Sequence, residues 1–128
     1  MSTLAASHAP STPLRVALWA GQAILAAMFL FAGGHKVANA AQFPFPAALT
    51  WFIGISELAG AVGVIVPALT RIKPVLTPVA AAALGLVMLL ATGFHVVRGE
   101  PFAMTLGLLA VALFVAWGRA FKAPIEPR

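Results

Sequence analysis

Four long apolar segments joined by short links constrain this chain more than any other feature of its sequence. They cover residues 14–34, 47–69, 74–97 and 101–121. A helix needs about 20 mostly apolar residues to cross the hydrocarbon of a bilayer, and each segment approaches or exceeds that length. Only 9% of the 128 residues are charged, whereas a soluble domain carries about 25%. We therefore expect an integral membrane protein whose first partner is the lipid bilayer.

The order of the segments predicts an all-α, up-down-up-down four-helix bundle. The links Lys36–Pro46, Thr70–Lys73 and Arg98–Glu100 are short, and short links make successive helices antiparallel neighbours. The basic residues divide six to two between the predicted sides of the membrane: Arg15, Arg71, Lys73, Arg119, Lys122 and Arg128 against Lys36 and Arg98. By the positive-inside rule, this bias places both termini of the multi-pass protein in the cytoplasm.

The two ends of the chain and the first link lie outside the predicted bundle. Residues 1–13 are rich in Ser, Thr and Pro and are expected to form a disordered tail, and residues 122–128 form a short cytoplasmic tail. Segment 37–46 is too apolar for an ordinary loop, so we expect it to lie in the outer interface or to fold back over the bundle. Ala38-Asn39-Ala40 resembles a signal-peptidase site, but the apolar run before it exceeds the usual length of about 7–15 residues. We expect this site to stay uncleaved.

Cysteine content and charge exclude several classes of function. The chain has no cysteine, so disulfides, thiolate metal sites and small membrane quinone reductases that use a cysteine pair are excluded. The net charge is +5, which on a membrane protein reports topology and contact with anionic lipid headgroups. The basic residues form no stripe interleaved with stacking aromatic residues, so no nucleic-acid partner is expected.

Glu57 is the only charged residue in the apolar stretch Thr50–Pro67. A carboxylate inside an apolar helix costs several kcal/mol unless a partner, a proton or water compensates it. We therefore treat Glu57 as a candidate functional residue. The alternative is a structural role, with the carboxylate paired to Lys36 or His95 or held protonated by desolvation.

Small residues lie next to Glu57 along the same segment. Gly60 shares its helix face and is expected to leave room beside the carboxylate. Alternatively, Gly60 and Gly63 serve only in helix packing, because small residues let membrane helices approach closely.

The other polar side chains gather at the outer ends of the segments. His35 and Lys36 end the first segment, His95 and Arg98 end the third, and Glu100 follows in the link. Because no charged residue lies at comparable depth in the inner half, we expect the polar chemistry to be confined to the outer half, where three helices converge on one pocket. Alternatively, the side chain of Lys36 bends toward the lipid headgroups instead of toward Glu57. Alternatively, Arg98 and Glu100 form an ion pair at the membrane interface that contributes little to stability.

Two histidines at one depth raise the question of a metal or haem. His35 and His95 could ligate one haem between two helices, and with Glu57 they could hold a single metal ion. A histidine at a membrane interface is more often a hydrogen-bonding residue. We therefore predict no metal, regard haem as an unfavoured cofactor and take a quinone as the cofactor to test.

Three motifs carry a resemblance to a known family. Phe31-Ala-Gly-Gly-His-Lys36, the glycine-rich stretch Ile55–Pro67 and His95-Val-Val-Arg-Gly-Glu-Pro101 resemble, in this order, signatures of the DoxX-like family of small bacterial membrane proteins. The similarity covers about Leu14 to Arg119. It implies a four-helix inner-membrane protein. The positions that match the family's polar residues are Lys36, Glu57, His95, Arg98 and Glu100.

The resemblance also implies two kinds of activity. Some relatives are linked to quinone-dependent sulfur oxidation, as the membrane subunit of a thiosulfate:quinone oxidoreductase. Others are associated with membrane complexes that defend against oxidative and thiol stress. Because this chain has no thiol, thiol chemistry would have to come from a partner or from the substrate.

Two hypotheses of function follow. In the first, the protein is a quinone-linked membrane subunit of an oxidoreductase with a redox partner protein; Glu57 relays a proton, and His95 or Lys36 donates a hydrogen bond to a quinone carbonyl. In the second, it is a non-catalytic membrane chaperone, scaffold or lipid-binding module, in which the charges lock the helices and the glycine faces dock a partner. A transporter is disfavoured, because four short helices without an inverted repeat would have to act as a homo-oligomer.

Overall fold

Helices form all the regular secondary structure of residues 10–128, the part of the chain that this computed structural model describes. The elements are α2 (Thr12–Ala38), the 3-10 turn η1 (Ala40–Gln42), α3 (Ala47–Thr70), α4 (Leu76–Val97), α5 (Ala103–Trp117) and the π-helical turn η2 (Gly118–Lys122). Four helices, with η2 as part of the last, are long and apolar enough to cross a membrane. The all-α fold with four membrane-spanning helices is confirmed. Of the disordered tail predicted over residues 1–13, residues 1–9 lie outside the described residues, whereas Thr12 and Pro13 belong to α2.

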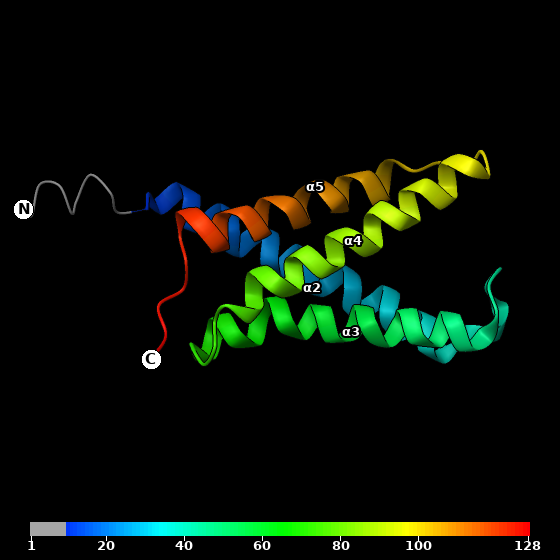
Figure 1. Cartoon of the computed structure of the whole chain (residues 1–128), viewed down its shortest axis with the longest axis horizontal. Coiled ribbons are helices and arrows are strands. Elements are labelled where there is room, and N and C mark those ends of the chain that lie inside the picture. The colour runs from blue at the N-terminus through cyan, green and yellow to red at the C-terminus, as the bar shows by residue number, and fades with distance from the viewer. Residues whose placement is uncertain (1–9) are drawn as a thin grey trace, which may run out of the picture.

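Successive helices pack against each other in antiparallel pairs. Gln22 of α2 contacts Val64 of α3, and the later Gly33 lies against the earlier Gly54. Figure 1 shows the blue start of α2 and the red end of α5 at the same end of the molecule. We call this the terminal end, and we call the opposite end, which holds residues 39–46 and 98–102, the distal end. Which side of the membrane each end faces stays a prediction.

α2 extends beyond the segment predicted for it, to Ala38 instead of residue 34. Gly33 does not end the helix, because it is buried against α3, and this packing outweighs the cost of glycine in a helix, about 1 kcal/mol. The helix is closed by Asn39, whose backbone N–H and side-chain amide each donate to the carbonyl oxygen of His35 at 3.0 Å. Lys36 therefore stands on a regular helical turn beside α3.

One turn at the terminal end and two prolines set the remaining helix ends. α3 is followed by Arg71 and Lys73, whose φ angles of 59° and 49° lie in the left-handed region and reverse the chain. α4 begins at Leu76 and α5 at Ala103, each two residues later than predicted. The reason is that Pro74 and Pro101 lie in the turns that lead into these helices.

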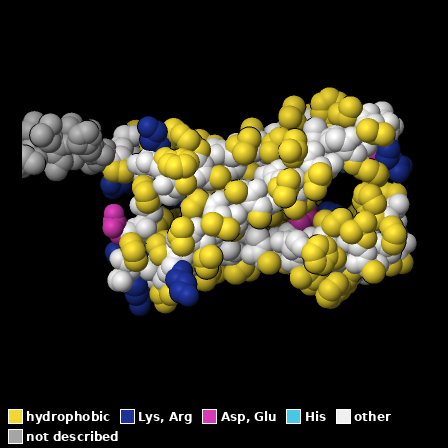
Figure 2. Space-filling model, in the orientation of Figure 1, with side chains coloured by type: hydrophobic (Ala, Val, Ile, Leu, Met, Phe, Trp, Pro, Cys, Tyr) yellow, Lys and Arg dark blue, Asp and Glu magenta, His cyan; other side chains and the backbone are white. Residues whose placement is uncertain are grey.

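A small apolar core joins all four helices, and the remaining apolar side chains cover the exterior. The core includes Leu25, Phe29, Ala61, Val64, Ala81, Leu84, Met88, Ala112 and Val115. Outside it, large apolar side chains such as Phe31 and Val97 are exposed by 76% and 87%. Figure 2 shows apolar side chains along the length of the molecule and Lys and Arg near its two ends. Such an exterior suits hydrocarbon rather than water.

The two hairpins, α2–α3 and α4–α5, pack tightly at the terminal end and separate toward the distal end. A Cβ added to Gly21 of α2 would lie 2.9 Å from the side chain of Val115 on α5. In the distal half, the hairpins meet through the rings of Phe45 and Phe94, whose centroids are 4.7 Å apart. Figure 2 shows an opening between the hairpins in this half, with acidic and basic side chains on its wall.

Candidate functional site

A buried ion pair joins α2 to α3 in the distal half. Lys36 Nζ lies 2.9 Å from Glu57 Oε1, and the side chain of Glu57 is 1% exposed while that of Lys36 is 22% exposed. A buried charge of one sign is tolerated when an opposite charge lies against it. Of the partners expected for Glu57, the structure therefore selects Lys36.

Two glycines bring the ion pair together. A Cβ on Gly33 would lie 2.7 Å from the backbone oxygen of Gly54, and a Cβ on Gly54 would lie 3.0 Å from Cβ of Lys36. The two backbones can approach this closely only because neither glycine has a side chain. Glu57 lies one turn beyond Gly54 on the same face, so this approach sets the distance from Lys36 to the carboxylate.

Two oxygen atoms on this face of α3 retain hydrogen-bonding capacity. Thr50 Oγ1 and Glu57 Oε1 are buried and have no hydrogen-bond partner among residues 10–128. Lys36 Nζ lies against Glu57 Oε1 at 2.9 Å as its ion-pair partner. Buried polar atoms in native proteins are nearly always satisfied. These two atoms are thus where a water molecule or a polar ligand group would bind.

The first link covers the distal end of the pair with aromatic rings. Phe43 lies with its ring centroid 5.8 Å from Lys36 Nζ, in the range of a cation–π contact. His35 lies between aromatic rings, stacked on Phe31 at 6.2 Å and edge-on to Phe43 at 5.5 Å. Its Nδ1 is 3.2 Å from the amide nitrogen of Asn39. His35 therefore belongs to an exposed aromatic cluster rather than to the surroundings of Glu57.

A second polar cluster lies on the other hairpin, where Gly99, with φ of 68°, turns the chain from α4 toward α5. His95 Nδ1 lies 2.9 Å from Glu100 Oε1, and Arg98 Nε donates to Glu100 Oε2 at 3.3 Å. The pair expected between Arg98 and Glu100 is therefore present, with His95 added to it. The hydrogen bond from His95, followed by the charge of Arg98, lowers the pKa of Glu100 from its ordinary value.

The predicted site residues thus form two clusters instead of one closed pocket. Glu57 and Lys36 lie on the α2–α3 hairpin, whereas His95, Arg98 and Glu100 lie where α4 turns toward α5. Residues 10–128 contain no group of three His, Cys, Asp or Glu side chains that could hold a metal ion. The metal site considered for His35, His95 and Glu57 is therefore not assembled in the part of the chain that the structure describes.

The space expected beside Glu57 at Gly60 is filled. A Cβ on Gly60 would lie 2.5 Å from Leu84 of α4, and one on Gly63 would lie 2.8 Å from Ala80. The expectation of room at Gly60 is wrong, because α4 packs onto this glycine. Both glycines are positions where α3 and α4 approach closely.

A buried network in the terminal half was missed by the sequence analysis. Gln22 is fully buried, and its Nε2 donates to the carbonyl oxygen of Val64 at 2.7 Å. Arg119 is 4% exposed and donates from Nε to Gln22 Oε1 at 2.8 Å. The expectation that polar chemistry is confined to the outer half is therefore wrong. The available signal was Gln22 itself, an amide on the same helix face as the core residues Leu18 and Leu25.

Comparison with known families agrees with this architecture. The model of the DoxX-like family matches residues 15–117. The chain belongs to the DoxX-like family. The DoxX-like match contains Lys36, Glu57 and His95 and stops before Arg119. Comparison with curated proteins and with solved structures finds no match.

Proposed function

We propose that this DoxX-like protein is a quinone-linked membrane subunit of an oxidoreductase. The observation that carries the proposal is the buried Lys36–Glu57 pair, whose carboxylate keeps hydrogen-bonding capacity in the half of the molecule where the hairpins separate (Figure 2). Charged side chains inside membrane-spanning helices are costly and commonly mark proton or substrate sites.

The residues of this site suit the headgroup of a quinone. The Lys36 ammonium has three N–H donors, and Glu57 does not use all of them, so one is available for a carbonyl oxygen. The hydroxyl of Thr50, which has no partner among residues 10–128, adds a second possible donor. Phe43 lies beside the ammonium and offers an apolar ring surface. A hydrophobic molecule that reaches the site from the bilayer needs this combination of a few polar groups and apolar walls.

The chemistry divides between this chain and its partners. A quinone, when bound, supplies an acceptor for two electrons and two protons. Glu57 would relay both protons in turn, taking up each one from water and passing it on, and Lys36 would stabilise negative charge on the oxygen that receives it. The electrons would come from a reduced sulfur compound or thiol held by a partner subunit, because this chain has no cysteine. His95, in the cluster with Glu100, would exchange protons with water at the distal end.

A non-catalytic module is the second candidate, and a specific observation favours it. The Lys36–Glu57 pair sits directly beside the closest approach of α2 and α3, at Gly33 and Gly54. In this case the pair only locks two helices of a scaffold, chaperone or lipid-binding protein. Such a lock requires no bound quinone.

Quinone content of the purified protein tests the proposal. Organic extracts of the native protein and of Lys36→Met should be compared by mass spectrometry for ubiquinone and menaquinone. We expect quinone in the native protein and about tenfold less in the variant, the factor that corresponds to one lost charge-assisted hydrogen bond of about 1.4 kcal/mol. Lys73→Met, which removes an exposed ammonium at the terminal end, is the matched control and should retain quinone. Equal quinone in Lys36→Met and Lys73→Met would rule out this site.

A further inference from the structure

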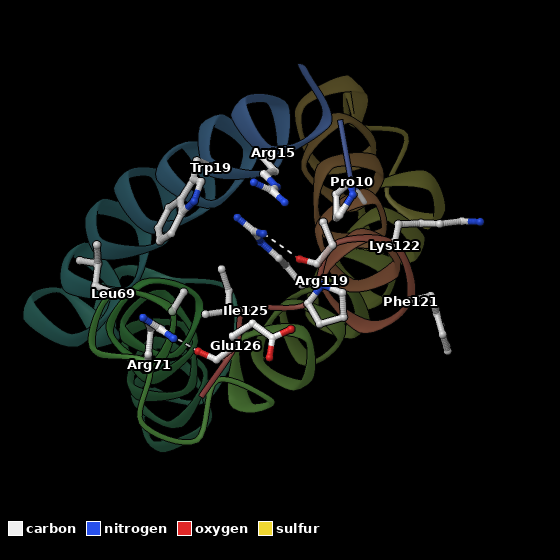
Figure 3. Close-up of a pocket in the computed structure, with 13 residues that line it drawn as sticks. Pro10, Arg15, Trp19, Leu69, Arg71, Arg119, Phe121, Lys122, Ile125 and Glu126 are labelled. Carbon is white, nitrogen blue, oxygen red and sulfur yellow. Dashed lines mark hydrogen bonds between the residues drawn. The ribbon is translucent and has the colours of Figure 1, made fainter. Parts of the chain in front are cut away.

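A pocket of about 750 Å³ opens at the terminal end, away from the Lys36–Glu57 pair. It lies between the first turns of α2, the end of α3, η2 and the residues that follow η2 (Figure 3). The chain after η2 closes one side, because Arg71 Nε donates to the backbone oxygen of Glu126 at 2.7 Å and Arg128 Nε donates to that of Thr70 at 2.9 Å. These bonds fix the last residues of the chain against the end of α3.

The lining of this pocket has a large excess of positive charge. Its ionisable side chains are four cations and one carboxylate: Arg15, Arg71, Arg119, Lys122 and Glu126. The ion pairs found in residues 10–128 all lie at the distal end. None of the four cations of the pocket therefore forms an ion pair with a carboxylate of residues 10–128.

Arg119 is held in place at the bottom of this charge cluster. It is 4% exposed, Gln22 accepts from its Nε, and the carbonyl oxygen of Ala123 accepts from its Nη1 at 2.8 Å. Its third nitrogen, Nη2, is buried without a hydrogen-bond partner among residues 10–128. Its guanidinium also lies 5.2 Å from the ring centroid of Trp19. Gln22, Ala123 and Trp19 thus orient the side chain, and the Nη2 nitrogen is left without a partner among residues 10–128.

Arg15 adds a second guanidinium beside the first. Figure 3 shows the nitrogen atoms of Arg15 and Arg119 pointing toward one another in the pocket that both residues line. An anion bound between two like charges in this position would offset their repulsion. The planar forks of two guanidinium groups match the oxygen atoms of a phosphate.

We propose that this pocket binds the phosphate group of an amphiphilic or soluble anion, with Arg119 and Arg15 as its principal ligands. Its polar part is bordered by the apolar side chains of Leu69, Phe121 and Ile125, which suit an acyl chain. The pocket lies at the ends of membrane-spanning helices, at the level of lipid headgroups. An anionic phospholipid and a free phosphate compound share this phosphate chemistry, and experiment can separate them.

Lipid binding to the intact protein tests the proposal. The full chain, purified in a neutral detergent, is titrated with phosphatidylglycerol or phosphatidylcholine and examined by native mass spectrometry. We expect one phosphatidylglycerol per chain, with affinity about tenfold above that for phosphatidylcholine, and about a tenfold loss of this affinity in Arg119→Met and Arg15→Met. Arg15 is exposed, so its variant should fold even if Arg119→Met does not. Lys73→Met, which removes a nearby exposed cation outside this pocket, should bind like the native protein.

Inorganic phosphate serves as the second probe and distinguishes the two sources. If millimolar phosphate leaves phosphatidylglycerol bound, the ligand is a lipid; if phosphate binds and displaces it, the ligand is a soluble phosphate compound. Both results support the proposal. It is overturned if both lipids bind equally and phosphate does not bind, or if Arg15→Met binds both anions as well as Lys73→Met does. Quinone content is measured separately, so a negative result for phosphate binding would not count against quinone binding beside Lys36 and Glu57.

Discussion

Glu57 is tolerated within an apolar helix because one cation lies against its carboxyl group. Lys36 comes from the neighbouring helix, at 2.9 Å, and is itself partly exposed. Loss of the Lys36 ammonium would leave a buried carboxylate that must take up a proton or bind water. The same substitution should therefore affect both the stability of the fold and proton transfer at Glu57.

Removal of Lys36 should destabilise the protein, and removal of both charges should restore much of the loss. We expect Lys36→Met to lower the free energy of unfolding by about 2 kcal/mol, less than for a fully buried pair, because Lys36 is partly exposed. Lys36→Met combined with Glu57→Leu should recover at least half of this loss. Denaturation in detergent, followed by circular dichroism, measures both. A double variant no more stable than Lys36→Met would contradict the pairing.

Glu100 should make stability depend on acid pH. Its pKa is lowered from the model-compound value of 4.5, mainly by the hydrogen bond from His95. A carboxylate with a lowered pKa in the folded state stabilises that state above its ordinary pKa, and the contribution is lost as pH falls through the folded value. Tm should therefore fall below about pH 4.5, and less steeply in Glu100→Gln. If Tm depends on pH identically in the native protein and in Glu100→Gln, the His95–Glu100 contact does not stabilise the fold.

At the scale of elements, the α2–α3 hairpin is organised by the approach of Gly33 to Gly54. A Cβ on Gly33 would lie 2.7 Å from the backbone oxygen of Gly54, whereas one on Gly34 would meet nothing within 4 Å. Adjacent glycines on one helix thus have opposite roles, which provides a controlled comparison.

The substitution Gly33→Ala should destabilise the hairpin, and Gly34→Ala should not. We expect Gly33→Ala to cost about 1–3 kcal/mol by forcing the two backbones apart, and Gly34→Ala to be neutral or stabilising by up to about 1 kcal/mol through helix propensity. Unfolding in detergent compares them, and quinone content shows whether the Lys36–Glu57 distance matters. Equal effects of the two substitutions would mean that the close approach does not stabilise the fold.

The helices themselves could be predicted from the sequence, but the positions of several helix ends could not. Apolar length identified all four spans. The continuation of α2 through Gly33 could not be predicted, because it depends on packing against Gly54, which local propensity does not encode. The depth of Arg119 was missed for a similar reason. A basic residue near a helix end usually extends to the headgroups, whereas here Gln22 and the turn η2 hold it inside.

At the scale of the whole molecule, polar chemistry is divided between the two ends. The distal half holds the Lys36–Glu57 pair and the His95–Glu100 cluster, and the terminal half holds the Gln22–Arg119 network. Candidate residues of the distal half could be chosen from the sequence because charges are rare in apolar segments. Their separation into two clusters could not, because it depends on how far the hairpins diverge.

The sides of the membrane can be assigned by labelling. The chain has no cysteine, so single cysteines can be introduced by Gln42→Cys at the distal end and Glu126→Cys at the terminal end. A membrane-impermeant maleimide that reaches only the outer face of the membrane should label the first at once and the second only after lysis, as the positive-inside rule predicts. The reverse pattern would invert the predicted orientation.

Photolabelling with a quinone analogue tests most directly whether a quinone binds beside Lys36 and Glu57. The native protein in membranes is irradiated with a ubiquinone analogue that carries an azide on its ring, and the labelled peptides are identified by mass spectrometry. We expect label on residues 36–57, with displacement by excess ubiquinone and loss in Lys36→Met but not in Lys73→Met. Label spread evenly over the lipid-facing surface of the four helices, or unchanged in Lys36→Met, would contradict the claim.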